Sequence, residues 1–347
     1  MHKQKKSKQV LKSFDEIFSQ NLKSHTKADL LDFLEFGYGE YIAQVFLKEW
    51  EFKKLLDTIE MLEIEHGKSL EMLINDEFKN IMLEDLNNRL LESTAIYEKD
   101  IKMAAVIQKS LLFEKAPVTK NYDLAFHFFP LASVSGDFYD FYIDDSKNLS
   151  GVVLADVSGH GIASGLLTAL AKPIFFRLFD KNKDIPLNQI VDLINSELVN
   201  ELGDSYNYLT GVILRFHDSD IEYVNAAHPD IIMKNAETGE CFNVNSPVKP
   251  INGSILGISS IIIPFDSYKF HVKKNDVLII YSDGLIESQD EKGEFFGREN
   301  IIKSLNNCPM EYSALQILDH LLKDHAMFIN KIPISDDITI IVLKKNS

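Results

Sequence analysis

Four apolar segments of the chain meet aspartate at one end, and these carboxylates are the side chains best placed to carry chemistry. The segments are VSGD (134–137), VVLAD (152–156), LIIYSD (278–283) and SDDITIIV (335–342). An ionised carboxylate at the buried end of a strand is costly unless it is paired or bound to a cation. A turn or capping role explains one such aspartate. Four in one domain, with few Lys or Arg beside them, indicate a hard divalent metal held by oxygen ligands.

Glycine accompanies these aspartates, and it lets the backbone turn tightly or approach a ligand closely. The glycines are Gly136, Gly159, Gly161 and Gly284. In the stretch SGDFYDFY (135–142), the side chains of an extended strand alternate between two faces. Asp137 and Asp140 therefore point into one site only if a bulge intervenes. We expect Asp137 to be a ligand and Asp140 to lie behind the ligands or on the surface.

The elements that must position these side chains follow Pro117. Strands are expected at 122–129, 151–156, 208–216, 221–226, 261–272, 276–282 and 338–343. Helices are expected at 161–179, where Pro173 should bend or end the helix, at 187–202 and at 313–328. Strands joined by short turns, with the helices in separate blocks, predict an α+β layered sandwich and not an alternating parallel sheet.

The segment from Ser13 to Leu112 reads as helices, because it lacks Pro and is dominated by Leu, Glu, Lys and Ile. One apolar stripe runs over 52–62, and a second, with near-heptad spacing, runs over 83–111 and is broken at Thr94 and Gln108. A long helix is therefore expected at about 70–112. Such a helix either packs on its own domain or pairs with a second copy and transmits a signal. The second role is open to it because an interrupted apolar stripe can pair in two registers. The sequence does not choose between the two.

The chain of 347 residues is acidic, with a formal net charge of −16, and most of the acidity lies in its C-terminal part. Residues 113–347 hold 32 acidic against 20 basic residues, whereas residues 1–112 hold 20 against 16. This balance argues against nucleic acid or an anionic membrane as a partner. We expect neither a signal peptide nor a membrane span. Cys241 and Cys308 form no disulfide framework, which indicates a cytoplasmic protein.

Five motifs follow one another along the chain. They are SGDFYDFY (135–142), ADVSGHGIASGL (155–166), VNAAHPDIIM (224–233), NDVLIIYSDGLIES (275–288) followed by EKGEFFG (291–297), and SDDITIIVL (335–343). In this order they resemble the type 2C metal-dependent protein phosphatases (the PPM family), and most of all the bacterial branch that includes SpoIIE and RsbU. The resemblance extends over 100–344, including IKMAAVIQKSLL, which is similar to the helix that leads into such domains. Nothing before Ile101 is recognised.

The resemblance implies a β-sandwich flanked by helices, with two manganese or magnesium ions in a cleft at one end. It also implies that phosphoserine or phosphothreonine in a protein is hydrolysed by a water molecule that the two metals activate. Carried over by position, the metal ligands are Asp137, Asp156, the carbonyl of Val157, Asp283 and Asp336. Asp337 stands where relatives outside this branch have Asn, and secondary roles are expected for Asp337, Asp140, Gly136 and Gly284.

Two histidines stand in the motifs. His160 lies in a Gly-His-Gly loop and is the candidate general acid for the leaving seryl oxygen, with a local hydrogen-bonding role as the alternative. His228 is expected to be structural. The chain has Ser135 and Ala227 where this branch usually has glycine, and Phe113 where many relatives have Pro, but none of these changes removes a ligand. No arginine that would hold the phosphate is identified.

We therefore expect an all-helical regulatory or dimerisation region (1–99), a linker helix (100–118) and a SpoIIE-like phosphatase domain (119–345). The expected partners are a phosphorylated protein, by resemblance an antagonist of an anti-sigma factor, a regulatory protein at the N-terminal helices, and a second copy of the chain. One alternative is a catalytically weak phosphatase fold that binds a partner, which retention of all four acids disfavours. A nucleotide cyclase is the other, and Ser-Gly-Asp-Phe resembles its motif only loosely.

Overall fold

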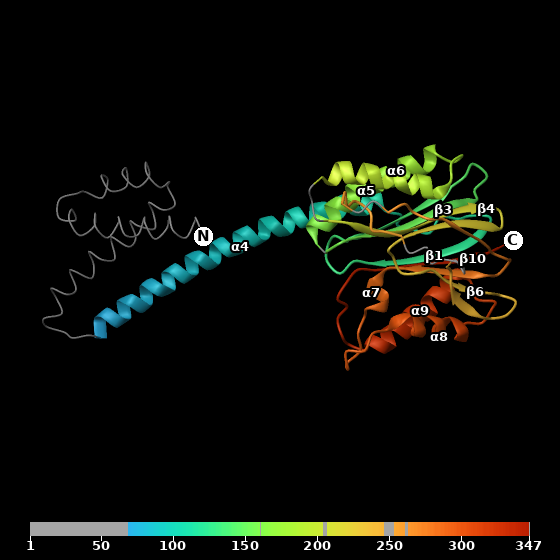
Figure 1. The fold of residues 1–347 in the computed structure, drawn as a ribbon. Coiled ribbons are helices and arrows are strands. Elements are labelled where there is room, and N and C mark those ends of the chain that lie inside the picture. The colour runs from blue at the N-terminus through green and yellow to red at the C-terminus, as the bar shows by residue number, and fades with distance from the viewer. Residues whose placement is uncertain (1–68, 160, 204–206, 246–252, 261–262, 347) are drawn as a thin grey trace. The chain divides into compact units, whose positions relative to one another are not determined.

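The computed structural model describes residues 69–159, 161–203, 207–245, 253–260 and 263–346. The chain divides into two units, Met1–Thr94 and Ala95–Ser347. Helix α4 (Ser69–Leu111) spans the boundary and corresponds to the helix predicted at 70–112 (Figure 1). The apolar stripe predicted over 52–62 lies outside the described residues.

The second unit is a sandwich of two five-stranded sheets, which confirms the α+β prediction (Figure 1). The first sheet has the strand order β1 (Tyr122–Phe129), β10 (Ile338–Lys345), β9 (Val277–Tyr281), β6 (Ile232–Lys234) and β7 (Cys241–Asn243). The second has the order β2 (Asp137–Ile143), β3 (Leu149–Val157), β4 (Leu209–His217), β5 (Asp220–Ala226) and β8 (Tyr268–His271). Every described pair of neighbouring strands is antiparallel.

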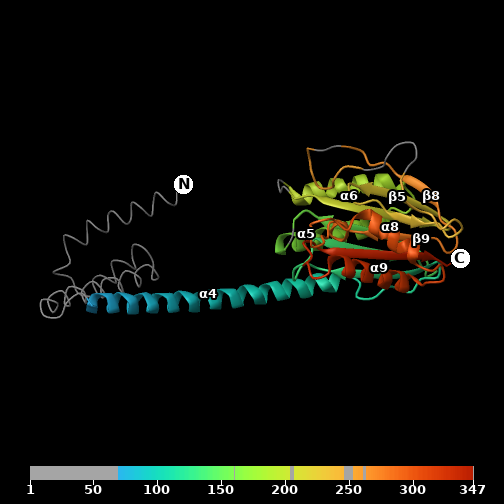
Figure 2. The ribbon, with the colours of Figure 1, turned by 90° about the horizontal axis from the view of Figure 1, so that it is seen from below.

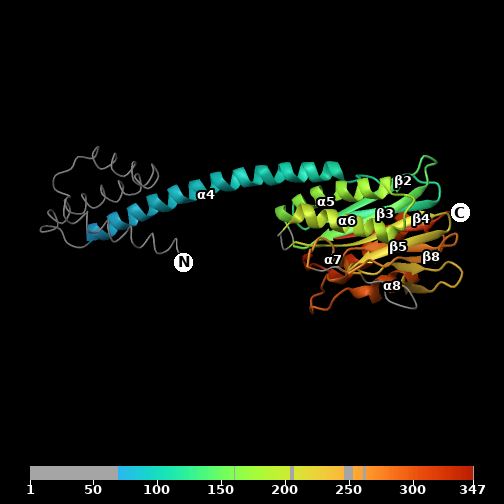
Figure 3. The same ribbon diagram turned by 45° about the horizontal axis from the view of Figure 1, so that its top comes forward.

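Helices cover the outer face of each sheet. Figure 3 shows α5 (Ile162–Lys181) and α6 (Leu187–Leu202) side by side over β3 and β4. On the first sheet lie α7 (Asp283–Ile286), α8 (Gly297–Asn307) and α9 (Ala314–Ile329), and α8 and α9 are neighbours (Figure 2). The N-terminus of α9 is fixed by a capping box, in which the side chains of Ser313 and Gln316 accept from each other's backbone N–H groups.

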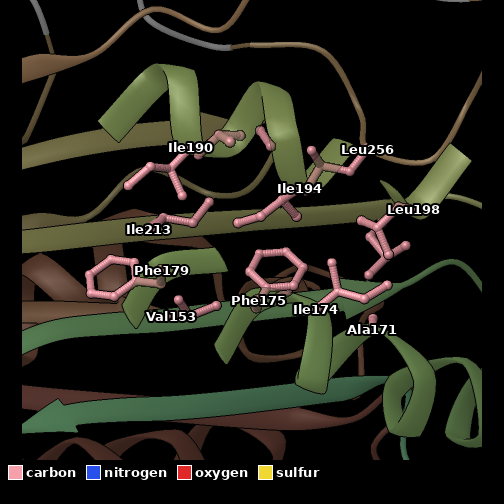
Figure 4. Packing of buried hydrophobic residues seen from close by; sticks show 14 of the residues in the cluster. Val153, Ala171, Ile174, Phe175, Phe179, Ile190, Ile194, Leu198, Ile213 and Leu256 are labelled. Carbon is pink, nitrogen blue, oxygen red and sulfur yellow. The ribbon is translucent and has the colours of Figure 1, made fainter. Parts of the chain in front are cut away.

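Three apolar clusters fill the layers. One lies between the sheets and takes alternate residues of their strands, among them Tyr139 and Phe141 of β2. The second packs α5 and α6 onto the second sheet, where Phe175 of α5 lies beneath Ile194 of α6 (Figure 4). A third lies under α8 and α9. The buried residues of α6 recur every three or four positions, the period that turns one face of a helix toward a core, and they are Leu187, Ile190, Val191, Ile194, Leu198 and Leu202.

Helix α5 differs from its prediction in two ways. Pro173 does not end it, because the helix continues to Lys181 and buries Phe175 and Phe179 beyond the proline. Each buried aromatic of this size contributes roughly 1.5–3 kcal/mol, which offsets the hydrogen bond that Pro173 removes. By length and composition alone, helix α5 could also cross a membrane, whereas no segment was expected to meet that test. Its contacts with β2, β3 and α6 account for that composition, because they make it a helix of the core.

Several short elements were not predicted. They are β6 and β7, with three residues each, and the helices α7 and α8, with four and eleven. Elements of this length carry too few periodic positions to be recognised in a sequence. The strand predicted over 261–272 is wrong in its extent, because the described part of it is extended only as β8 (Tyr268–His271).

Candidate metal centre

Strand register brings the predicted carboxylates to one end of the sandwich. Asp137, the first residue of β2, pairs directly with Asp156 on β3. Asp283 lies just beyond the end of β9, and Asp336 and Asp337 lie just before β10, its antiparallel neighbour. Burial raises the pKa of Asp156 to about 9, and the charges of the other four carboxylates raise it in the same direction. The five groups therefore lie close enough to act on one another.

Asp137 is held from the opposite sheet. It is only 1% exposed, and its Oδ2 accepts a hydrogen bond of 2.5 Å from Oγ1 of Thr339 on β10. Burial raises the pKa of Asp137, and hydrogen bonds from Thr339 and Ser282 oppose that shift. Thr339 also donates its backbone N–H to Oγ of Ser282 at 2.9 Å, so the ends of β9 and β10 and the carboxylate form one network. Sequence reasoning missed Thr339, which is one strand residue among ITIIV.

Gly136 leaves room for two of the predicted oxygen donors. A Cβ atom on Gly136 would lie 2.8 Å from the carbonyl oxygen of Val157 and 3.0 Å from Oδ1 of Asp156. Any side chain there would push both oxygens away. Ser135 is fully buried, and its Oγ accepts the backbone N–H of Asp137 at 3.0 Å. The serine therefore stabilises the turn that presents Asp137.

Asp283 begins the one-turn helix α7. Burial, Asp336 and Glu287 raise the pKa of Asp283 to about 6. Glu287 lies one turn later in the segment SDGLIES, and the sequence analysis did not select it. Only glycine fits at position 284, where the backbones of Gly284 and Asp337 lie close together. A Cβ atom on Gly284 would lie 2.1 Å from the carbonyl oxygen of Asp337.

Asp337 braces the loop that leads into β2. Its Oδ1 accepts the N–H of Leu131 at 2.6 Å, and its Oδ2 accepts the N–H of Gly136 at 2.7 Å. The backbone N–H of Asp337 in turn donates to Oδ1 of Asp336 at 2.8 Å. Both carboxylate oxygens of Asp337 are thus occupied by backbone groups, which suits a supporting role in the site.

Asp140 lies on the other face of β2 from Asp137, as strand alternation requires. It is buried, so the expectation that allowed it on the surface is wrong. Nζ of Lys172 on α5 lies 2.9 Å from Oδ1 of Asp140 and donates to the carbonyl of Tyr139 at 3.1 Å. Burial raises the pKa of Asp140 and lowers that of Lys172, and the attraction between the two opposes both shifts. This ion pair fastens α5 to β2 and stands outside the acid cluster.

Gln108, near the end of α4, binds the backbone beside the site. Its Oε1 accepts the N–H of Ser135 at 2.9 Å, and its Nε2 donates to the Ser135 carbonyl and to Oγ1 of Thr168, both at 2.7 Å. It therefore pairs with Ser135 much as a neighbouring strand would, and it joins α4, β2 and α5. In the sequence, Gln108 is visible only as a break in an apolar seam. A polar residue in such a seam is the signal that could have found it, because buried polar groups need partners.

Of the two histidines in the motifs, only His228 is among the described residues. His160 lies outside the described residues, so its role as general acid stays a prediction. Its neighbours Gly159 and Gly161 have φ of 86° and 92°, a region that favours glycine. His228 is buried, with Nδ1 2.9 Å from Oγ1 of Thr210, and burial lowers its pKa to about 3. It is therefore a neutral structural group at pH 7.

The donor set fits hard divalent cations by type and by charge. Every predicted ligand atom is an oxygen, and no lysine or arginine among the described residues offsets the raised pKa of Asp137 or Asp283. Within the described part of the chain, no three His, Cys, Asp or Glu side chains are arranged closely enough to coordinate a metal ion as they stand. Ionised carboxylates repel one another, so a set of this kind gathers closely only around a cation.

The sequence is similar to known phosphatases. A family model described as Stage II sporulation protein E (SpoIIE) matches residues 146–346, more than half of the chain. The chain is 26% identical over 255 residues to phosphoserine phosphatase RsbU of Bacillus subtilis (strain 168), which covers 72% of the chain and 70% of the relative. It is 26% identical over 194 residues to phosphoserine phosphatase RsbP of the same organism, with 55% and 46% covered.

Solved structures share the fold. The SiaA-PP2C domain of Pseudomonas aeruginosa superimposes with a TM-score of 0.60 at 15% identity, covering 73% of this chain and 99% of that one. The RsbU and RsbW domains of Rv1364c from Mycobacterium tuberculosis give a TM-score of 0.52 at 16% identity, covering 68% and 63%. At these identities the likeness establishes the sandwich fold.

Proposed function

The chain belongs to the SpoIIE family of metal-dependent protein serine/threonine phosphatases, and on that premise we propose that it removes phosphate from phosphoserine or phosphothreonine in a regulatory protein. The observation that carries this proposal is the gathering of Asp137, Asp156, Asp283 and Asp336 at one end of the sandwich. The relatives RsbU and RsbP are named phosphoserine phosphatases, which favours phosphoserine as the substrate. By resemblance, an antagonist of an anti-sigma factor is the substrate to test first.

We propose that these four aspartates and the carbonyl of Val157 hold two manganese or magnesium ions. Support comes from the all-oxygen donor set, the mutual repulsion of the acids and the space that Gly136 leaves beside two of the donors. When bound, two divalent cations supply an activated water and neutralise charge on the phosphoryl group.

The protein's own groups would orient these ligands. Thr339 fixes the Asp137 carboxylate, and Asp337 fixes the loop before it through Gly136. A ligand held in this way loses little conformational freedom when it binds. His160 is proposed to deliver a proton to the leaving seryl oxygen, because it follows Asp156 and Val157 closely in the sequence.

Phosphate release from a phosphoserine peptide by the full chain tests the assignment. We expect turnover with manganese, loss of turnover in EDTA, and a fall in kcat/KM of at least roughly 100-fold in Asp283→Asn. Asp145→Asn is the matched control, since that acid is exposed in the turn after β2. A folded wild-type protein without manganese-dependent turnover would overturn the proposal and favour a regulator that keeps the fold without the chemistry.

We further propose that residues 1–99 form a regulatory and dimerising region of a cytoplasmic protein. The support is that Leu83, Leu86 and Leu90 on α4 are each more than half exposed, and apolar side chains at such spacing pair helices in coiled coils. The free cysteines fit a reducing compartment. Sedimentation equilibrium should show a dimer that Leu86→Glu with Leu90→Glu converts to a monomer. A monomeric wild type excludes the dimer.

A further inference from the structure

Strand β1 is a long and unprotected edge of the first sheet. Among the described strands its eight residues pair with β10 alone, and the register runs without a shift from Tyr122 opposite Lys345 to Phe129 opposite Ile338. An edge strand exposes N–H and C=O groups that pair readily with another chain, and proteins shield such edges with lysine, proline, bulges or short strands. The sequence of β1, YDLAFHFF, has no lysine or proline, and its one charged side chain, Asp123, accepts the backbone N–H of Ala314 on α9 at 2.7 Å.

The other three sheet edges are shielded. β7 and β8 have only three and four residues. At β2, Lys172 donates to the carbonyl of Tyr139, and Gln108 occupies both backbone groups of Ser135, two residues before the strand begins. Among the described residues, side chains donate to the backbone of β1 only at its first residue, where the Thr119 hydroxyl bonds the carbonyl of Tyr122. The outer edge of β1 is thus the longest of the four, and its one such bond lies at the end of the strand.

A groove of about 650 Å³ runs along this edge. The consecutive residues Leu124–Phe128 line it together. Side chains of a strand alternate between faces, so five consecutive residues line one groove only where it follows the backbone edge. The facing wall is formed by the linker residues Leu112–Ala116 and by Leu315 of α9. Five residues of extended chain span about 16 Å, which suits a short peptide strand.

The chemistry of the groove is aromatic at its floor and basic at its rim. The rings of Phe126 and Phe128 pack on Tyr139 at 4.8 and 5.6 Å. Three exposed charged side chains line the groove, Lys109, Glu114 and Lys115, and Lys109 lies 3.4 Å from the Glu114 carboxylate, so two lysines stand against one glutamate. Basic side chains at an apolar groove stand out in a domain with an excess of acidic residues.

From these features we propose that β1 binds an extended segment of another protein, one with apolar residues at alternate positions and acidic residues beside them. Main-chain hydrogen bonds to a sheet edge would supply affinity, and alternate side chains in the groove would supply specificity. Charge argues against the chain's own N-terminus, MHKQKKSK, which is basic. It also argues against a second copy paired through β1, which would bring a second set of lysines to the same groove. This site is separate from the metal centre and does not depend on the phosphatase activity.

Hydrogen exchange of the full chain with a synthetic peptide tests the proposal. The probe is acetyl-EEVTVTVEE-amide, and the controls are the same peptide with N-methyl groups on alternate backbone amides and the peptide with every Glu replaced by Lys. The unmodified peptide should slow amide exchange in 123–129, and N-methylation or the charge reversal should weaken binding at least roughly tenfold. Equal binding by the N-methylated peptide, or no protection of 123–129, overturns the proposal.

Two protein variants complete the test. Lys115→Glu should weaken binding of the acidic peptide, whereas Lys120→Glu, the same charge change outside the groove lining, should not. Equal effects of the two variants would show a nonspecific charge effect and overturn the site. Protection of 123–129 that appears without peptide and grows with protein concentration would identify a second copy as the occupant, which contradicts the proposal.

Discussion

Replacing Gln108 with alanine tests whether the long helix α4 holds the candidate metal centre in shape. The side chain makes three buried hydrogen bonds, two with the backbone of Ser135 and one with Thr168. At about 1 kcal/mol for each bond, Gln108→Ala should destabilise the sandwich by about 3 kcal/mol. Ser135 is 0% exposed, so water does not replace the lost partners.

The same change should loosen the turn that presents Asp137. Ser135 lies two residues before Asp137 and caps its N–H, so a shift of Ser135 moves the predicted ligand. We expect the manganese concentration for half-maximal activity to rise about tenfold, as for other residues that orient a ligand from behind. Gln108→Glu keeps the acceptor for the Ser135 N–H but buries a carboxylate against the Ser135 carbonyl oxygen, so it should destabilise the protein at least as much as alanine does.

Guanidinium unfolding in EDTA measures the stability, followed by near-ultraviolet circular dichroism of the tyrosines. Tyrosines are chosen because the single tryptophan, Trp50, belongs to the first unit and not to the sandwich. Lys109→Ala is the control, because its side chain is 74% exposed one position further along the helix. A loss of less than about 1 kcal/mol for Gln108→Ala, or an equal change in manganese dependence for Lys109→Ala, would refute the reasoning.

Three further predictions follow from single sites. Lys172→Met leaves the Asp140 carboxylate buried without its partner and should lower the free energy of unfolding by about 3–5 kcal/mol. Adding Asp140→Asn to the same protein should recover part of that loss. No recovery would show that the buried charge is not the cause. Ala227 has φ of 54°, so Ala227→Gly should stabilise by about 1 kcal/mol and raise Tm by about 2–4 °C, and a lower Tm would contradict this. The pKa of His228 is about 3 in the folded protein and near 6.5 when unfolded, so its contribution to stability is complete above pH 6.5 and falls as the pH drops toward 3. At pH 4.5 that loss is about 2–3 kcal/mol, and the unfolding free energy of His228→Gln should depend less steeply on pH than that of wild type; parallel curves would rule out His228 as the titrating group.

Local patterns were sufficient for the longer elements. Strand β1 begins and ends where the alternation of YDLAFHFF predicted, and α6 has the predicted bounds because its apolar residues follow the helical period without interruption. The alternative that Pro173 ends its helix is wrong, because the burial of Phe175 and Phe179 beyond it depends on the neighbouring layers and outweighs the local preference of proline. Short strands such as β6 and β7 exist mainly through pairing with a sheet that forms elsewhere in the chain.

The sequence by itself determined which carboxylates stand at strand ends, that Asp137 and Asp140 face opposite ways, and that the motifs follow the order of a phosphatase family. Only the tertiary structure decided what holds those carboxylates. Thr339 and Asp137 are 202 positions apart, and Gln108 reaches Ser135 across 27. Such hydrogen bonds depend on which strands become neighbours and on their register. Periodicity within a segment records only whether each side chain faces the core, and it contains no information about the distant group that the side chain meets there.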